Sequence, residues 1–322
     1  MFDIFDISKS TMITSASNTV KKRGIFMQIL IFCCVMMVAS TIVSAITLLP
    51  TMLWMLLDGN FKDLLKESLE TGVLDMSAIL ATMPEWLTVV SLVATAGEII
   101  APMLYCRLLE RRSLASMGFT RKKAVPTYLV GYLVGAVMIT AAAAICVLMG
   151  AIDIKIASVI PVGMIIIFFV AYLIQGLAEE TLLRGYLMTS IAASSSSRYA
   201  VALAVGINSV LFSLLHLGNT GISGLSLLNI ALAGIFFSLY VLRTDNIWGA
   251  AAAHSAWNFV QGPILGIQVS GTVTKSTAFV TTAKDGMAWL SGGDFGLEGG
   301  MAVTIVLLVA ILLISIKKPK NE

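Results

Sequence analysis

Long apolar stretches, separated by short polar or charged segments, run along most of this 322-residue chain. A bilayer span needs about 20 mostly apolar residues, and eight segments follow that pattern. They are Ile25–Leu49, Trp86–Cys106, Pro126–Gly150, Ala157–Leu187, Ala200–Leu217, Leu225–Leu242, Ile247–Ile267 and Met301–Ile316. The pattern therefore predicts an all-α fold: a polytopic integral membrane helical bundle with about eight transmembrane helices.

The composition points the same way. Hydrophobic residues make up 58% of the chain and charged residues 12%, and the mean hydropathy is +0.93. A soluble globular domain carries about 25% charged residues, so a soluble fold is excluded and the lipid bilayer is the first predicted partner. The basic clusters flank the apolar segments without interleaved aromatic residues, and no nucleic acid partner is predicted.

Basic residues are distributed unevenly between the two sides of the predicted spans. With the N-terminus inside, fifteen of the twenty-one Lys and Arg residues fall in inner segments. These are Lys9, Lys21, Lys22, Arg23, Arg107, Arg111, Arg112, Arg121, Lys122, Lys123, Arg198, Arg243, Lys317, Lys318 and Lys320. The outer loops hold Lys62, Lys66, Lys155, Lys275 and Lys284. This asymmetry follows the positive-inside rule and predicts a multi-pass protein of the cell (plasma) membrane with both termini cytoplasmic.

The same pattern divides the chain into four parts. Residues 1–24 form a polar cytoplasmic arm, and residues 25–156 hold the first transmembrane helices with one outer loop. Residues 157–262 concentrate the unusual polar groups and are the predicted functional core. Residues 263–322 comprise an outer loop and the last transmembrane helix. That outer loop is rich in Gly, Ser and Thr, so we expect it to be mobile or irregular.

Two adjacent carboxylates and an arginine lie inside one apolar segment, at Glu179, Glu180 and Arg184. Ionisable groups at membrane depth are costly and mark functional sites. Because residues four apart share a helix face, Glu180 and Arg184 can form an ion pair. Glu179 is left as the freer carboxylate, suited to act as a general base. The alternative is a helix-packing salt bridge with a second acid at the water interface. A third acid, Glu98, also lies in a predicted span, and its role is open.

The only two histidines of the chain lie in patterned apolar stretches, at His216 and His254. The turn between the fourth and fifth segments lies midway between Glu179 and His216, so antiparallel helices would bring these two residues level. His254 and Asn258 share one helix face and can hold a metal ion, a water molecule or a substrate oxygen. Asn is a good oxyanion donor. The alternative for this pair is a polar clamp between membrane helices.

Three motifs occur in order within about eighty residues: Glu179-Glu180-x-x-x-Arg184, Phe212-x-x-x-His216 and His254-x-x-x-Asn258. This series resembles that of the CPBP family. Its members are Abi-like intramembrane proteases related to the CAAX prenyl endopeptidases and to bacteriocin-processing or immunity proteins. The resemblance covers about residues 157–262, and it implies an all-helical, eight-span fold with a cavity that opens into the membrane.

The resemblance also implies roles for the residues of the three motifs. The catalytic set would be Glu179, Glu180, Arg184, His216, His254 and Asn258. Glu179 would activate water, and Arg184 would support the acids. The family has been described both as glutamate-type and as metal-dependent. Glu179, His216 and His254 would make three Zn²⁺ ligands with an open fourth position, while the same groups could hold a water molecule and an oxyanion without a metal.

The sequence thus leads to the hypothesis of an intramembrane endopeptidase whose partner is a membrane-associated peptide or protein substrate. CAAX-type processing and bacteriocin-related processing or immunity are the candidate settings. The rival is a proton-coupled transporter or a non-catalytic membrane scaffold that uses the same buried polar groups. The sequence has no internal repeat and no pair of matching broken helices, features that many transporters show.

Overall fold

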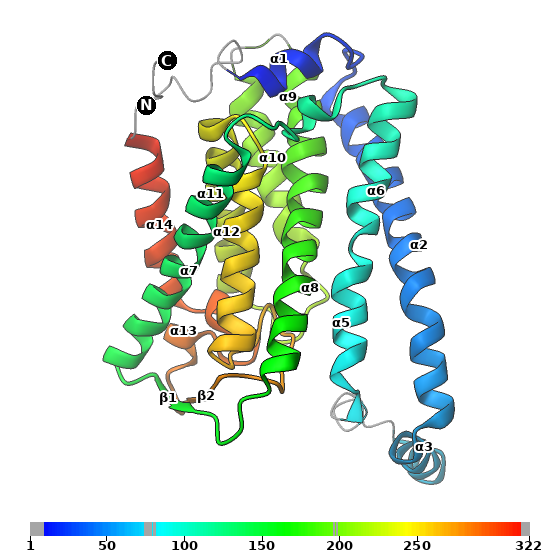
Figure 1. Ribbon diagram of the computed structural model, residues 1–322, viewed down its shortest axis with the longest axis vertical. Coiled ribbons are helices and arrows are strands. Elements are labelled where there is room, and N and C mark those ends of the chain that lie inside the picture. The colour runs from blue at the N-terminus through cyan, green and yellow to red at the C-terminus, as the bar shows by residue number, and fades with distance from the viewer. Residues whose placement is uncertain (1–9, 74–78, 80–81, 196, 198, 317–322) are drawn as a thin grey trace.

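The computed structural model describes residues 10–73, 79, 82–195, 197 and 199–316, and it is a helical bundle (Figure 1). Five helices are long and apolar enough to cross a membrane. These are α2 (Ile25–Leu57), α7 (Ala124–Leu148), α11 (Gly224–Thr244) and two composite helices, Glu85–Leu109 and Val162–Ser194. The first composite joins α5 (Glu85–Ala94), α6 (Gly97–Leu104) and the π-helix η3 (Tyr105–Leu109). The second joins α8 (Val162–Glu180), the π-helix η5 (Thr181–Met188) and α9 (Thr189–Ser194).

Three further helices of the bundle are shorter. They are α10 (Ala200–Leu214), α12 (Trp248–Phe259), which continues as the π-helix η6 (Val260–Ile264), and α14 (Met301–Ile316). Each of the eight predicted segments therefore contains a helix, and the predicted class, a polytopic helical bundle, is confirmed. The number of eight spans stays a prediction, because these three are shorter than a span usually requires.

Large apolar side chains cover much of the outside of the bundle. Phe26 is 79% exposed, and Leu129 on α7 and Leu313 on α14 are more than half exposed. Soluble monomers rarely expose contiguous apolar surface of this extent, whereas lipid tails solvate it. The chain is therefore a multi-pass membrane protein.

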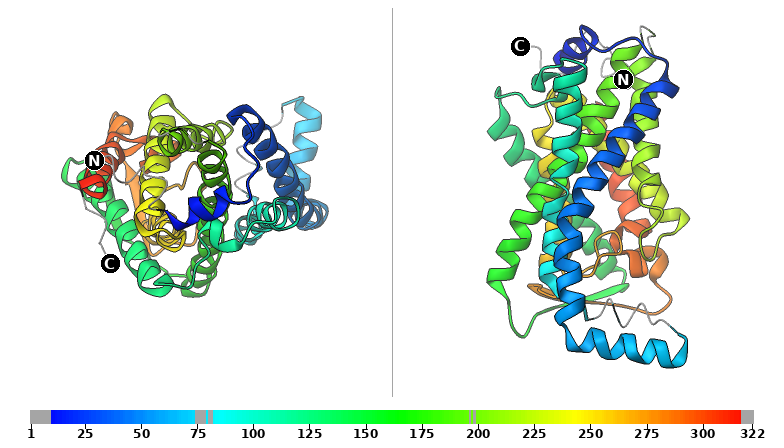
Figure 2. Two further views of the ribbon diagram at one scale, coloured as in Figure 1. Left: turned by 90° about the horizontal axis from the view of Figure 1, so that it is seen from above. Right: turned by 90° about the vertical axis from the view of Figure 1, so that its right-hand side faces the viewer.

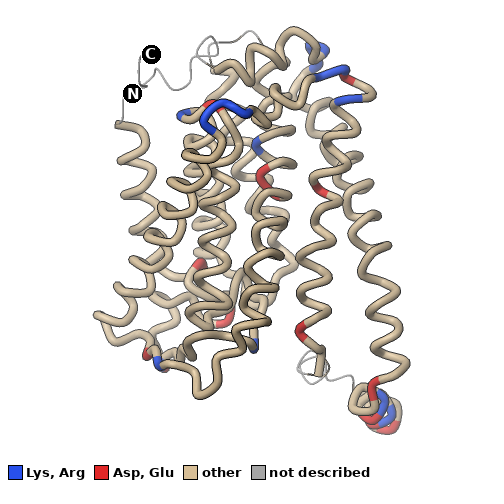
Figure 3. Tube along the Cα trace, in the orientation of Figure 1, with Lys and Arg blue, Asp and Glu red and all other residues tan. Residues whose placement is uncertain are grey.

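The two ends of the bundle differ in charge and in structure. The basic end carries α1 (Thr11–Ser17), which lies across it (Figure 2), the 3₁₀-helix η4 (Leu114–Met117) and most of the Lys and Arg residues (Figure 3). The opposite end, which we call the sheet end, carries α3 (Gly59–Thr71) and the antiparallel strands β1 (Ile152–Ile156) and β2 (Phe279–Ala283). α14 ends at the basic end (Figure 1).

The short helix α12 is packed unusually tightly between α7 and α8. A Cβ atom at Gly131 would lie 2.1 Å from the carbonyl oxygen of Gly249, and one at Gly135 would lie 2.0 Å from that of Ala253. On the other side, a Cβ at Gly176 of α8 would lie 2.7 Å from the backbone nitrogen of Ser255. Small residues let membrane helices approach this closely. α7 contacts Ala253 and α8 contacts Ser255, so the backbone of α12 is fixed directly before and directly after His254.

The segment between η6 and α14 is more ordered than its composition predicts. β2 pairs with β1, and it is followed by α13 (Ala288–Ser291) and the 3₁₀-helices η7 (Gly293–Phe295) and η8 (Leu297–Gly299). Phe295 and Leu297 are fully buried. The expectation of an irregular loop was wrong, because these apolar side chains insert into the sheet end of the bundle and hold the glycine-rich turns in place.

Candidate functional site

Glu180 is completely buried and accepts two charged or polar donors on one oxygen. Its Oε1 lies 2.8 Å from Nη1 of Arg184 and 3.0 Å from Nδ1 of His254. The first contact is the ion pair expected from the spacing of four residues. The second joins α8 to α12. A carboxylate behind an imidazole fixes which ring nitrogen carries the proton, so Glu180 orients His254 with Nε2 turned away from it.

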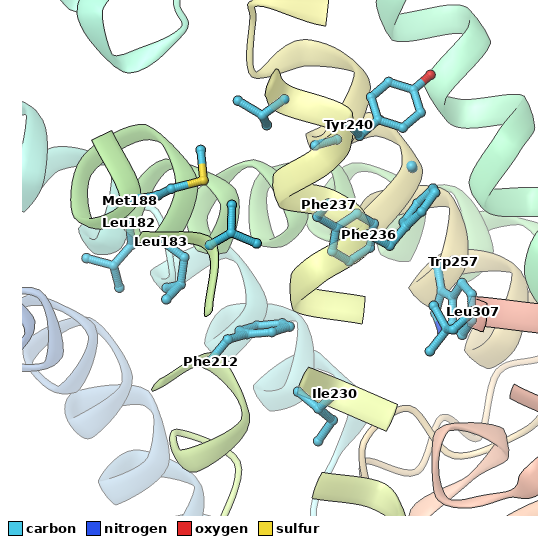
Figure 4. Packing of buried hydrophobic residues seen from close by; sticks show 14 of the residues in the cluster. Leu182, Leu183, Met188, Phe212, Ile230, Phe236, Phe237, Tyr240, Trp257 and Leu307 are labelled. Atoms are coloured by element: carbon cyan, nitrogen blue, oxygen red, sulfur yellow. The ribbon is translucent and has the colours of Figure 1, made fainter. Parts of the chain in front are cut away.

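Two phenylalanines enclose the Arg184 and His254 side chains. The Arg184 guanidinium lies 4.5 Å from the centre of the Phe212 ring and 5.5 Å from that of Phe237. The His254 ring stacks on Phe237, with 5.0 Å between centroids. Phe212 and Phe237 belong to the buried apolar cluster of the bundle (Figure 4). These aromatic faces attract the buried cation and keep water away from the ion pair.

The Glu179 side chain is 20% exposed, whereas that of Glu180 is fully buried. Oε1 of Glu179 accepts a hydrogen bond from Nε2 of Gln175, one turn earlier on α8. Its Oε2 is buried and has no hydrogen-bond partner among the described residues, and it lies 3.7 Å from Nε2 of His254. An unpaired buried carboxylate oxygen is costly unless water or a ligand binds it, so Oε2 and Nε2 together mark a position for a small polar molecule.

Gln175 connects Glu179 to Asn258. The Asn258 carboxamide donates from Nδ2 to Oε1 of Gln175 over 2.9 Å, so one buried amide holds both motif residues at once. Gln175 was not among the residues predicted from the sequence. The spacing could have predicted this contact, because Gln175 lies four positions before Glu179 and therefore on the same helix face.

His216 approaches the site from a different side. It lies two residues after the end of α10, and its Nδ1 is 2.8 Å from the carbonyl oxygen of Phe212. A carbonyl only accepts hydrogen bonds, so Nδ1 carries a proton and Nε2 is the nitrogen available for chemistry. No hydrogen bond or ion pair joins His216 to Glu179, His254 or Asn258 in the described part of the chain.

His216, His254 and Asn258 line a cavity of about 40 Å³ together with Glu298 of the ordered outer segment, and Glu179 is not among the residues that line it. A water molecule fits in a space of this size. Burial raises the pKa of Glu298, and hydrogen bonds from Ser270 and the neighbouring His216 oppose that shift. Glu98 of α6 lies near enough to Glu179 for the two carboxylates to interact. Neither Glu98 nor Glu298 belongs to the three motifs.

The Zn²⁺ ligands suggested by the sequence do not converge. No group of three or more His, Cys, Asp or Glu side chains among the described residues is placed to hold one metal ion. His254 and His216 both turn Nδ1 toward oxygen acceptors, and the Nε2 atoms approach the cavity from different elements. As placed, Glu179, His216 and His254 do not fit a zinc centre.

Residues 161–260 match a family model described as Type II CAAX prenyl endopeptidase Rce1-like. The matched segment contains all three motifs and covers somewhat under a third of the chain. Comparison with curated proteins and with solved structures gives no match. The match confirms the family resemblance of this segment. That family is one of proteases. Five helices of this chain are long and apolar enough to cross a membrane.

Proposed function

We propose that this protein is an intramembrane endopeptidase in which Glu179 activates the water molecule that attacks a peptide carbonyl. One observation carries the proposal. The two adjacent carboxylates differ in surroundings: Oε1 of the fully buried Glu180 is bound by Arg184 and His254, whereas Glu179 is 20% exposed and its Oε2, without a hydrogen-bond partner among the described residues, lies 3.7 Å from Nε2 of His254. This difference is what a structural acid and a catalytic base require.

The geometry supports a role for each group. Glu179 takes one proton from water as the water oxygen bonds to the carbonyl carbon. Gln175 holds the other oxygen of that carboxylate, and one N–H of the Asn258 carboxamide is left for the substrate. In its doubly protonated form, His254 donates Nε2–H to the developing oxyanion together with Asn258. Donors fixed in a dry site stabilise such an oxyanion strongly.

His216 completes the reaction by supplying a proton to the leaving nitrogen. When the C–N bond breaks, the nitrogen keeps the bonding electron pair and takes the proton from Nε2 of His216. The proton held by Glu179 then passes to His216 and restores both groups. The sum is one peptide bond and one water molecule converted to an acid and an amine.

We infer the substrate class from the membrane setting and the matched family. A peptide or protein segment anchored in or at the bilayer is the substrate, and CAAX-type or bacteriocin-related processing is its setting. Residues 157–262 supply the chemistry, and the basic end of the bundle faces the cytoplasm of a cell in whose plasma membrane the chain lies.

The test is cleavage by the purified chain in lipid vesicles. The substrates are membrane-anchored peptides, including farnesylated peptides that end in a CAAX sequence, and products are detected by mass spectrometry. Wild type should cleave at least one peptide, and Glu179→Gln should cleave none. Glu67→Gln on the exposed face of α3 is the matched control and should cleave like wild type. No cleavage by wild type, or cleavage by Glu179→Gln, would overturn the proposal.

A further inference from the structure

The carboxylate of Glu298 reaches the cavity of the site from outside the matched segment. It belongs to η8, just before α14, and lines the same cavity as His216, His254 and Asn258. No motif contains it, and it follows the last matched residue by almost forty positions. The bundle thus brings a further acid to the side of the cavity where His216 lies.

Three hydrogen bonds hold this carboxylate, and all of them end on Oε2. The backbone nitrogen of Ser270 lies 2.7 Å away, the Ser270 hydroxyl 3.0 Å and Nε2 of Gln261 3.3 Å. Among the described residues no hydrogen bond occupies Oε1. The side chain is therefore anchored through one oxygen, while the other remains available to a group in the cavity.

Ser270 adopts a backbone conformation that favours this arrangement. It has φ of 48°, and Gly271 follows with φ of 86°, at the tip of a turn between Val269 and Thr272. Positive φ at both central residues is typical of Asn-Gly or Gly-Gly turns. A serine there is less common, and its hydroxyl and N–H both point to Glu298. The positive φ of Ser270 therefore places two hydrogen-bond donors on the Glu298 carboxylate.

The same turn is tied to the segment that carries His216. Nδ2 of Asn219 donates to the carbonyl oxygen of Ser270 over 3.0 Å, and the backbone nitrogen of Asn219 donates to the carbonyl oxygen of His216. On the other side, Nδ2 of Asn229 donates to the backbone carbonyl of Glu298 over 2.8 Å. These backbone contacts fix Glu298 and His216 on the wall of the same cavity, and among the described residues no hydrogen bond or ion pair joins their side chains.

We propose that Glu298 is a positioning residue for His216: the negative charge of its carboxylate, on the wall of the same cavity, stabilises the imidazolium whose Nε2–H is directed at the leaving nitrogen. This inference rests on the proposed function. The Phe212 carbonyl oxygen accepts from Nδ1 of His216, and Glu298 places a negative charge on the wall of the cavity that the imidazole also lines. Glu298 forms and breaks no covalent bond. Its charge stabilises the doubly protonated imidazole before the C–N bond breaks.

The experiment uses the fact that the chain has only two histidines. Wild type labelled with ¹⁵N-histidine gives two imidazole spin systems, and a His216→Gln spectrum assigns them. Glu298→Gln should move the His216 imidazole signals and leave those of His254 in place. Asp285→Asn, an exposed position of the same outer segment, is the control and should change neither set.

Kinetics provide the second measurement. Glu298→Gln should lower kcat about 10-fold to 100-fold, or roughly 1.4–2.7 kcal/mol of transition-state stabilisation, with KM nearly unchanged. If the His216 signals stay in place in Glu298→Gln, the inference is wrong, whatever happens to kcat. If wild type cleaves no peptide, the proposed function fails, and the spectra still decide whether Glu298 acts on His216.

A variant that preserves the turn guards against misfolding. Ser270→Gly accepts a positive φ without strain and removes only the hydroxyl donor. It should shift the His216 signals in the same direction as Glu298→Gln but less. A normally folded Ser270→Gly whose His216 signals match wild type would contradict the proposed coupling.

Discussion

Helices α2 and α12 show two ways of placing a helix in this bundle. α2 has 33 residues, and only five of them are buried: Gln28, Phe32, Val35, Ala39 and Trp54. α12 has 12 residues, and ten of them are buried, including His254 and Asn258. The long helix faces lipid for most of its length, whereas the short one is surrounded by α7, α8 and α11.

The difference explains where the polar chemistry lies. A lipid-facing helix must be apolar over about 20 residues, because lipid offers no hydrogen-bond partners. A helix enclosed by protein can be short, and its neighbours can pair its polar groups. α12 uses small residues for close packing and pairs His254 with Glu180 and Asn258 with Gln175. A hydropathy criterion for spans therefore detects α2 but not α12, the short helix that carries His254 and Asn258.

The largest effect on stability should come from breaking the buried ion pair beside α12. Arg184→Met leaves the Glu180 carboxylate buried without its cation, and this should lower the free energy of unfolding by about 3–5 kcal/mol. Unfolding by SDS titration, followed by tryptophan fluorescence, measures the change. The double variant Glu180→Gln with Arg184→Met should regain part of the loss. A single variant as stable as wild type would show that the pair does not hold this region.

The next largest effect should come from the contact between α7 and α12. Gly135→Ala places a Cβ 2.0 Å from the Ala253 carbonyl oxygen, and such overpacking should cost about 1–3 kcal/mol. The control is Gly163→Ala on α8, where no atom lies within 4 Å of the new Cβ. The control should be as stable as wild type or more so, since alanine favours helix. Equal SDS-unfolding curves for both variants would refute the tight packing of α12.

A smaller effect, on rate rather than on stability, is expected at Gln175. Gln175→Met keeps the volume but removes the amide that holds Glu179 and Asn258. The cleavage rate should fall about tenfold, or roughly 1.4 kcal/mol, while the SDS-unfolding curve changes little. A rate equal to wild type in single-turnover assays would exclude Gln175 as a positioning residue.

The matched change on α2 should have the smallest effect. Gln28 is buried like Gln175, but neither of its amide atoms has a hydrogen-bond partner among the described residues. Gln28→Met should leave the cleavage rate unchanged and keep or slightly raise stability, because it removes a buried unpaired amide. A rate loss in Gln28→Met as large as in Gln175→Met would mean that both substitutions act through packing alone.

The sequence was sufficient for the helical class and for the ion pair of Glu180 and Arg184, whereas the placement of His254 beside the acids came only from the family resemblance. The first two follow from apolar periodicity and from spacings of four residues within a helix. Gln175 carried the same local signal and was overlooked.

Glu298 could not be predicted in this way. Its position depends on the path of the outer segment through β2, η7 and η8, and on Ser270, which has no sequence-local relation to His216. The close approach of α7 to α12 likewise depends on which helices are neighbours. Hydropathy alone does not contain that information. For the same reason, the sequence could not decide whether Glu179, His216 and His254, the zinc set that the family resemblance allowed, come together, and the described side chains do not form such a set.

The division of labour between Glu179 and Glu180 is the central claim, and a paired comparison of Glu179→Gln with Glu180→Gln tests it most directly. Each variant is measured for SDS unfolding and for single-turnover cleavage. We predict that Glu179→Gln unfolds like wild type and loses cleavage by about 10²-fold or more. We predict that Glu180→Gln is clearly destabilised, because Arg184 and His254 lose their shared acceptor. A Glu179→Gln protein that is destabilised as much as Glu180→Gln, or that still cleaves at the wild-type rate, would contradict the account.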